Sequence, residues 1–172
     1  ILVSLMHAEA EMDEPFICCY SDILFTPEVI SRAAASPDDI SLVVDTDWRD
    51  RYVARTHHPT DDAEKVTTLN GSVTRVHREI ADGDAHGEYT GVAKFSAAGA
   101  ESLKAHYHAR RREFAGKPFR EAAGFEKAYL IHLLQDMIEA GVSMSHVDTH
   151  GGYMEIDTQQ DYDLARDHWK AT

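Results

Sequence analysis

Two short apolar runs, each followed by an acidic residue, constrain the fold of this chain most. Residues 16–20 (Phe-Ile-Cys-Cys-Tyr) are followed by Asp22, and residues 40–44 are followed by Asp45. The first run is uninterrupted and the second contains only one polar residue, Ser41, and such runs are typical of strands that are buried on both faces, as in parallel sheets. Between them, a Thr-Pro-Glu sequence at 26–28 has the pattern of a helix N-cap with proline at the first helical position. The order strand, helix, strand predicts an α/β fold.

The rest of the chain continues this alternation and adds one hairpin. Asn70 and Gly71 favour a type I′ turn, which predicts a hairpin between 65–69 and 72–76. We expect one domain over residues 1–172, with a Rossmann-like mixed, mainly parallel sheet flanked by helices and an inserted β-hairpin. The other expected elements are a first amphipathic helix ending near Pro15, helices over 97–114 and 118–140, strands over 91–95 and 153–156, and a last helix from Thr158.

Charge and cysteine usage limit the partners. The formal net charge is −13, which argues against binding to nucleic acid or to an anionic membrane surface. No apolar run approaches the ~20 residues that a membrane-spanning helix needs. The adjacent Cys18 and Cys19 fit a core strand better than a disulfide, so we expect a cytoplasmic protein. A nucleotide remains compatible with the charge if a divalent cation neutralises its phosphates.

Three acidic residues are the strongest candidates for chemistry. In open α/β sheets, ligands bind beyond the carboxyl ends of the strands, where Asp22 is expected. Glu155 and Asp157 are two residues apart, so the strand period places them on one side. Together they predict an oxygen-rich site suited to Mg²⁺. The spacing alone is equally compatible with structural roles: a cap for Asp22, and a charge at the N-terminus of the last helix for Asp157.

The histidines do not predict a second metal site. There are eleven, including the pairs His57-His58 and His106-x-His108. Neither pair joins a Cys or His cluster at the spacing of a zinc site, so no zinc site is expected.

Two segments that contain the acidic residues resemble the metal-binding segments of the sugar-nucleotidyltransferase-like superfamily. They are Phe16-Ile-Cys-Cys-Tyr-Ser-Asp-Ile-Leu-Phe25 and Tyr153-Met-Glu-Ile-Asp-Thr158, the latter followed by Gln159-Gln-Asp-Tyr-Asp-Leu164. Between them, in the family's order, are Asp47-Trp-Arg49, Glu64-Lys-Val66, Gly87-Glu-Tyr-Thr-Gly91 and Lys127-Ala-Tyr-Leu130. This set is most similar to the phosphonoalkyl (2-aminoethylphosphonate-type) cytidylyltransferases and, more distantly, to bacterial choline-phosphate cytidylyltransferases.

The resemblance implies the fold of the nucleotide-diphospho-sugar transferases and an Mg²⁺-dependent reaction. A phosphonate or phosphate oxygen would attack the α-phosphorus of CTP and release pyrophosphate. Asp22 and Asp157 would hold Mg²⁺, with Glu155 as a further metal ligand, and Lys65 would join Asp22 and Asp157 as a catalytic residue. Basic side chains would bind the phosphonate oxygens, and aromatic side chains would contact the headgroup. The expected substrate contacts are Trp48, Arg51, Lys94 and Tyr153, with Arg49 and Arg55 as further basic candidates.

One part of the superfamily's pattern is missing from this sequence. Its members begin with a strand and a Gly-rich loop with basic residues, which holds the nucleotide. We therefore expect an N-terminally incomplete domain that is inactive alone, and that either forms a homo-oligomer through an open strand edge or lies beside a missing N-terminal segment. The alternatives are a sugar-1-phosphate or choline-phosphate nucleotidyltransferase, and a truncated, non-catalytic binding domain. For the last of these, the missing loop argues in favour and the retained acidic residues argue against.

Overall fold

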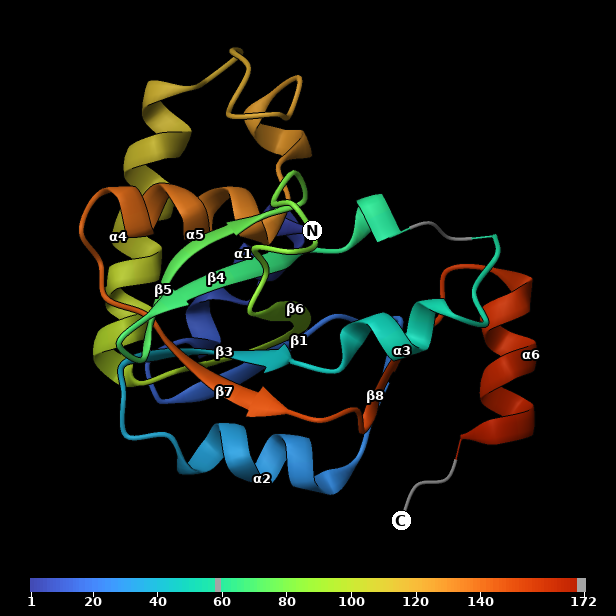
Figure 1. Cartoon of the computed structure of the whole chain (residues 1–172). Helices are drawn as coiled ribbons and strands as arrows, with labels where there is room; N and C mark the ends of the chain where they lie inside the picture. Colours follow the sequence, from blue (N-terminus) through green and yellow to red (C-terminus); the bar gives the residue numbers. More distant parts are fainter. Residues whose placement is uncertain (58–59, 170–172) are drawn as a thin grey trace.

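The computed structural model describes residues 1–57 and 60–169, and a six-stranded sheet lies at its centre (Figure 1). The strand order is β1-β6-β3-β7-β5-β4, and β4 also pairs with β6, so five of the strands close into a ring. Of these pairs, β3 and β7 run parallel and the others are antiparallel. The strands are β1 (Phe16–Cys19), β3 (Ile40–Asp45), β4 (Lys65–Leu69), β5 (Ser72–His77), β6 (Gly87–Phe95) and β7 (Ser145–Thr149).

The sheet is mixed, as expected, but the expectation that it is mainly parallel is wrong. Strand β6 accounts for much of the difference, because it runs antiparallel to β1, β3 and β4. Gly91 lies between the part of β6 that pairs with β4 and the part that pairs with β1. Its φ is +78°, and a Cβ there would lie 2.5 Å from the ring of Tyr20, so a glycine is required. A mostly apolar run indicates that a strand is buried, and β3 is buried throughout. Such a run carries no information on the direction of the strand.

Helices cover both faces of the sheet. Helix α2 packs on one face, where Val29 and Ala33 contact Val43 and Val92. Helices α1, α4 and α5 contribute to the larger core on the other face (Figure 1). No helix in the described parts of the chain is long and apolar enough to cross a bilayer. The α-helices are α1 (Leu2–Met6), α2 (Pro27–Ala35), α3 (Trp48–Tyr52), α4 (Ala97–Glu113), α5 (Leu130–Glu139) and α6 (Gln159–His168), and short 3₁₀ helices span Glu9–Glu11, Thr60–Asp62 and Phe125–Lys127.

Local sequence signals predict several boundaries correctly. Asn70 and Gly71 both have positive φ, 51° and 81°, as the type I′ turn of the hairpin requires. Helix α2 begins at Pro27, directly after Thr26. Helix α6 begins after Thr158, whose Oγ1 accepts a hydrogen bond from the amide of Asp161. These signals act over a few residues and do not depend on the rest of the fold.

Two of the predicted helices are shorter than expected. The first ends at Met6, and a separate 3₁₀ turn follows it. The helix expected over 118–140 begins only at Leu130, because the preceding residues form a bend instead. In this bend Phe119 pairs with Ala122, and Arg120 between them has φ +51°, which a right-handed helix cannot contain.

A small second sheet joins the two segments that carry the predicted metal ligands. It consists of β2 (Ile23–Phe25) and β8 (Tyr153–Glu155), which run antiparallel. Ile23 pairs with Glu155, and the amide of Ile156 donates to the carbonyl of Asp22 at 2.8 Å. The pairing therefore sets Asp22 beside the late acidic segment, although the two are far apart in the sequence.

Candidate functional site

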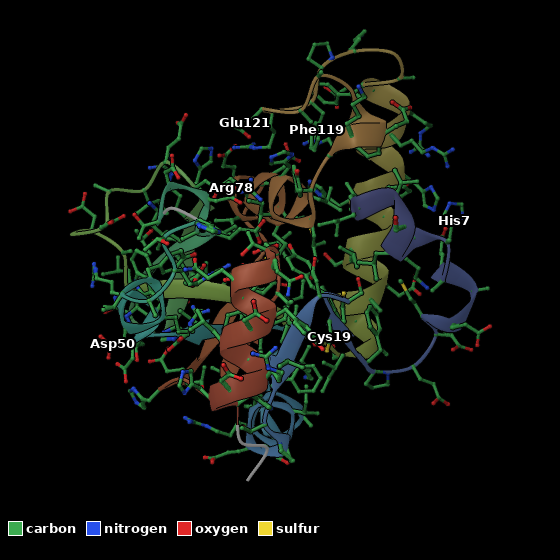
Figure 2. All side chains as sticks on the ribbon, turned by 90° about the vertical axis from the view of Figure 1, so that its right-hand side faces the viewer. His7, Cys19, Asp50, Arg78, Phe119 and Glu121 are labelled. Atoms are coloured by element: carbon green, nitrogen blue, oxygen red, sulfur yellow. The ribbon has the colours of Figure 1, made fainter. Side chains whose placement is uncertain are left out.

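A pocket of about 180 Å³ lies beside this small sheet. Six of its lining residues are Asp or Glu, and we refer to it as the acidic pocket. All three predicted metal ligands, Asp22, Glu155 and Asp157, line it. Figure 2 views the molecule from this side, with α6 in front and Arg78, another lining residue, above it. The lining residues are Ile1, Tyr20, Asp22, Asp62, Glu64, Arg78, Glu88, Tyr89, Tyr129, Tyr153, Glu155 and Asp157.

The carboxyl groups of this pocket are crowded and partly desolvated. Burial, and then the neighbouring carboxylate of Asp157, raise the pKa of Glu155 to about 8. Burial raises the pKa of Glu64 to about 7, although Arg78 and Tyr20 oppose the shift. Burial also raises the pKa of Glu88. Carboxylates in such surroundings retain protons unless a cation neutralises them. The pocket is therefore suited to bind a cation.

The donor atoms fit Mg²⁺ better than a softer metal. Asp22, Glu155 and Asp157 all offer carboxylate oxygens, the ligands that hard divalent cations prefer. They do not form a group whose ligand atoms all lie within 4.8 Å of one another. A bound ion would therefore draw them closer or be held partly through water, and Mg²⁺ usually keeps several of its waters. Their role as metal ligands remains a prediction.

Arg55 holds the late acidic segment in place. Its Nη2 lies 3.0 Å from Oδ2 of Asp157, and its Nη1 lies 4.0 Å from Oε2 of Glu155. Its Nε donates to Oδ1 of Asp161 at 2.7 Å. Asp161 is fully buried and also accepts from the amide of Thr158 at 2.8 Å. This network connects the first turn of α6 to the acidic pocket. The sequence indicated Arg55 only as a possible phosphonate ligand.

A second cavity, of about 230 Å³, shares Tyr153 and Glu155 with the acidic pocket. We call it the arginine pocket, because both Arg51 and Arg55 line it. The Nε of Arg51 lies 3.0 Å from Oδ2 of Asp45, and its guanidinium stacks on the ring of Tyr153 at 4.3 Å. The Nη1 atoms of both arginines are buried without a hydrogen-bond partner. The arginine pocket is lined by Asp50, Arg51, Ala54, Arg55, Tyr153, Met154, Glu155, Leu164, His168 and Trp169.

The other predicted substrate and catalytic residues lie outside these two pockets. Trp48 is fully buried in a small cluster with Tyr52 and Ala63. Lys65 is also buried, and its Nζ lies 2.9 Å from Oδ1 of Asp82. The Nζ of Lys94 donates to the carbonyl of Asp38 at 2.5 Å, near the end of β6 that is distant from Glu88. Arg49 stacks on Trp48 at 4.8 Å and donates to the carbonyl of Asp82.

Tyr20, Glu64, Arg78 and Glu88 are among the lining residues of the acidic pocket that were not predicted from the sequence. The hydroxyl of Tyr20 donates to Oε2 of Glu64 at 2.9 Å, and Nη2 of Arg78 lies 3.4 Å from Oε1 of the same carboxylate. Arg51 and the hydroxyl of Tyr52 bind Glu88 in a similar way. A signal existed for both glutamates, because each lies in a segment with the family resemblance and beside residues of a predicted strand. Arg78 has no comparable signal.

Comparison with known proteins identifies relatives of this chain. No protein-family model matches it. The chain is 24% identical over 155 residues to CTP:phosphoglutamine cytidylyltransferase from Campylobacter jejuni, an alignment that covers 90% of this chain and 60% of that protein. Among solved structures, the inositol-1-phosphate CTP transferase from T. maritima matches with a TM-score of 0.65, at 20% identity, over 92% of this chain and 56% of that one.

A third relative is the CTP:phosphocholine cytidylyltransferase from Streptococcus pneumoniae, with a TM-score of 0.63 and 18% identity over 96% of this chain and 62% of that one. The chain thus spans less than two thirds of the length of each of these relatives. The chain shares the mixed α/β fold of the two solved structures. Most of its length aligns in sequence with the Campylobacter jejuni cytidylyltransferase. The chain is thus similar in sequence to one cytidylyltransferase and similar in fold to solved nucleotidyltransferases.

Proposed function

We propose that this chain carries the metal-binding and headgroup-binding part of a cytidylyltransferase, which transfers CMP from CTP to a small phosphate or phosphonate headgroup. The observation that carries the proposal is the position of Asp22, Glu155 and Asp157 on one acidic pocket, although they come from distant parts of the sequence. The similarity to a cytidylyltransferase over 90% of the chain supports the choice of CTP.

The reaction needs no nucleophile from the protein. An oxygen of the acceptor's phosphate or phosphonate forms the new bond to the α-phosphorus of CTP, and the bond from that phosphorus to the bridging oxygen breaks, which releases pyrophosphate. A phosphate monoester is largely ionised near neutral pH, since its second pKa is about 6, so its oxygen needs no general base. Catalysis then depends on positioning and on neutralising the charge of the phosphates.

The acidic side chains would provide that neutralisation through a bound cation. Asp22 and Asp157, with Glu155, would hold Mg²⁺, which when bound supplies positive charge to the phosphates of CTP and orients them. Arg55 keeps Asp157 and Glu155 in place through its contacts at 3.0 and 4.0 Å. In this role Arg55 is a positioning residue for the carboxylates.

The arginine pocket provides a place for the acceptor. Arg51 and Arg55 are held by carboxylates on some of their nitrogens, yet each retains a buried Nη1 that makes no hydrogen bond. A phosphate or phosphonate oxygen would satisfy these donors with charge-assisted hydrogen bonds. Because this cavity shares Tyr153 and Glu155 with the acidic pocket, an acceptor bound here would lie next to the nucleotide phosphates.

A pyrophosphate-release assay tests the proposal on the natural full-length protein that contains this chain. The four nucleoside triphosphates would be combined with 2-aminoethylphosphonate, phosphocholine, inositol-1-phosphate and a hexose-1-phosphate, in the presence of Mg²⁺. We expect the fastest turnover with CTP and a small phosphonate or phosphate headgroup. Faster turnover with UTP or dTTP and the hexose phosphate would assign the protein to the sugar nucleotidyltransferases, and no release with any pair would overturn the proposal.

A further inference from the structure

A cluster of two histidines and one aspartate includes none of the residues that line the two pockets. His86 precedes β6 by one residue, while His146 and Asp148 lie two apart on β7. Since strand residues alternate between faces, His146 and Asp148 point to the same side of β7, and Val147 between them packs in the core beneath α2. We call these three residues the histidine cluster.

The histidine cluster is compact. Nε2 of His86 lies 2.9 Å from Oδ1 of Asp148, and Nδ1 of His146 lies 2.7 Å from the same oxygen. The two imidazole rings meet edge to face, with their centroids 4.7 Å apart. All three ligand atoms lie within 4.8 Å of one another, which no other set of three Asp, Glu, His or Cys side chains in the described residues achieves.

Other histidines of the chain form a different arrangement. His106 contacts Asp136 at 2.5 Å, and His108 contacts Glu9 at 2.7 Å, so each forms a pair with one carboxylate. His58, which belongs to the other pair noted in the sequence, lies outside the described residues. In the histidine cluster, two imidazoles from different elements converge on a single carboxylate oxygen. A metal ion requires several ligand atoms that converge on one point, whereas an ion pair requires only two groups in contact.

We propose that His86, His146 and Asp148 bind one divalent transition-metal ion of the zinc class, with water as the remaining ligand. Two imidazoles and one carboxylate are a ligand set that zinc accepts, whereas Mg²⁺ prefers oxygen ligands. In a tetrahedral zinc site the ligand atoms lie about 3.3–3.5 Å apart, given metal–ligand distances of about 2.0–2.1 Å. The separations of 2.7 and 2.9 Å would open by about half an ångström, which the partly exposed side chains allow.

The surroundings provide an entry path and a structural role. His146 and Asp148 also line a solvent-open cavity of about 530 Å³ beside the end of α2, through which a hydrated ion can reach them. The amide of His86 donates to the carbonyl of Val66 at 2.8 Å, so His86 is anchored to β4. An ion at the histidine cluster would therefore connect the β4 side of the ring to β7, and would stabilise the fold independently of the proposed reaction.

Metal titration of the 172-residue chain, stripped of metal, tests this proposal. We expect one Zn²⁺ per chain by calorimetry, a higher unfolding temperature with Zn²⁺, and no displacement of the ion by excess Mg²⁺. The His146→Ala and Asp148→Asn variants should lose zinc affinity by more than about tenfold. Replacing residues that only hydrogen-bond to metal ligands already lowers metal affinity by about that factor. The matched control His106→Ala removes a partly buried imidazole that contacts one aspartate, and it should keep the zinc affinity.

Cobalt provides a second readout that needs no variant. Co²⁺ bound by nitrogen and oxygen should give visible ligand-field bands typical of a tetrahedral site, without the near-ultraviolet charge-transfer band of thiolate ligation. Equal zinc affinity in all variants, a thiolate band that indicates Cys18 or Cys19, or no zinc binding by the wild-type chain would each overturn the proposal. Loss of zinc binding in the cluster variants alone, with a thiolate-free cobalt spectrum, would support it.

Discussion

The acidic pocket and the histidine cluster both bring together residues from distant parts of the chain, but they differ in how their charges are balanced. In the acidic pocket, six acidic residues and Arg78 line a partly buried space, and the pKa values of Glu64, Glu88 and Glu155 are raised. In the histidine cluster, each imidazole contacts the carboxylate of Asp148, and the pKa of Asp148 is lowered. The crowded carboxylates of the acidic pocket favour a bound cation through their charge. The histidine cluster is already balanced by hydrogen bonds and favours a metal ion only through the positions of its ligand atoms.

The largest expected effect comes from removing a charged ligand from the acidic pocket. In the full-length protein, Asp157→Asn should lower the rate of CMP transfer by more than about 100-fold. Replacing residues that only hydrogen-bond to metal ligands already lowers activity by about 10–100-fold, and loss of a ligand itself should cost more. The rate is measured by pyrophosphate release at saturating Mg²⁺ and CTP. The control Asp163→Asn makes the same substitution on an exposed part of α6 and should leave the rate unchanged. A loss below about tenfold for Asp157→Asn would show that this carboxylate does not hold the cation.

A second effect concerns the arginine that balances part of the acidic charge. Replacing Arg55 with Gln leaves Asp161, which is fully buried, without its guanidinium partner. We expect the free energy of unfolding to fall by about 3 kcal/mol, since breaking a buried ion pair leaves an uncompensated charge. Urea denaturation in metal-free buffer measures this change. The control Arg166→Gln, on the exposed side of α6, should have no measurable effect. Equal stability of Arg55→Gln and wild type would mean that Arg55 does not balance the buried charge.

A smaller effect is expected in the dependence of stability on pH. The pKa of Glu64 is raised from 4.5 to about 7, so the native state keeps a proton that the unfolded state has already lost. Stability contributed by this group is therefore present below about pH 4.5 and declines as the pH rises to about 7, by an amount on the order of 1–3 kcal/mol. Glu64→Gln should remove this decline. Urea denaturation of both proteins across this interval, without metal, measures the difference, and identical slopes would contradict the expected burial of charge.

The sequence predicted local features of this fold better than distant pairings. The turn at Asn70 and Gly71 and the cap at Thr158 follow from the chemistry of a few neighbouring residues, and both are confirmed. The direction of β6 depends on which strands it meets, and no local pattern contains that information. Strand β7 was not predicted, because its sequence Ser-His-Val-Asp-Thr contains a single large apolar residue between polar ones.

The same distinction applies to the candidate sites. Asp22, Glu155 and Asp157 could be predicted because they lie in two segments with recognisable order. The contacts of Glu155 and Asp157 with Arg55, and the contact of His86 with Asp148, depend on tertiary structure, and no sequence spacing indicates them. Lys65 differs from these residues, since its motif suggested catalysis while its Nζ lies 2.9 Å from Oδ1 of Asp82 and outside both pockets. Whether Lys65 acts in catalysis stays a prediction.

Anomalous diffraction from crystals of the protein soaked with Mn²⁺ and, separately, with Zn²⁺ would test the difference between the two sites most directly. Mn²⁺ replaces Mg²⁺ at oxygen-rich sites, and Zn²⁺ prefers imidazole. We expect the manganese peak to lie in the acidic pocket, coordinated by Asp22 and Asp157, and the zinc peak to lie between His86, His146 and Asp148. A manganese peak at the histidine cluster, or no peak within coordination distance of Asp22 and Asp157, would contradict the assignment of the acidic pocket as the site of the catalytic cation.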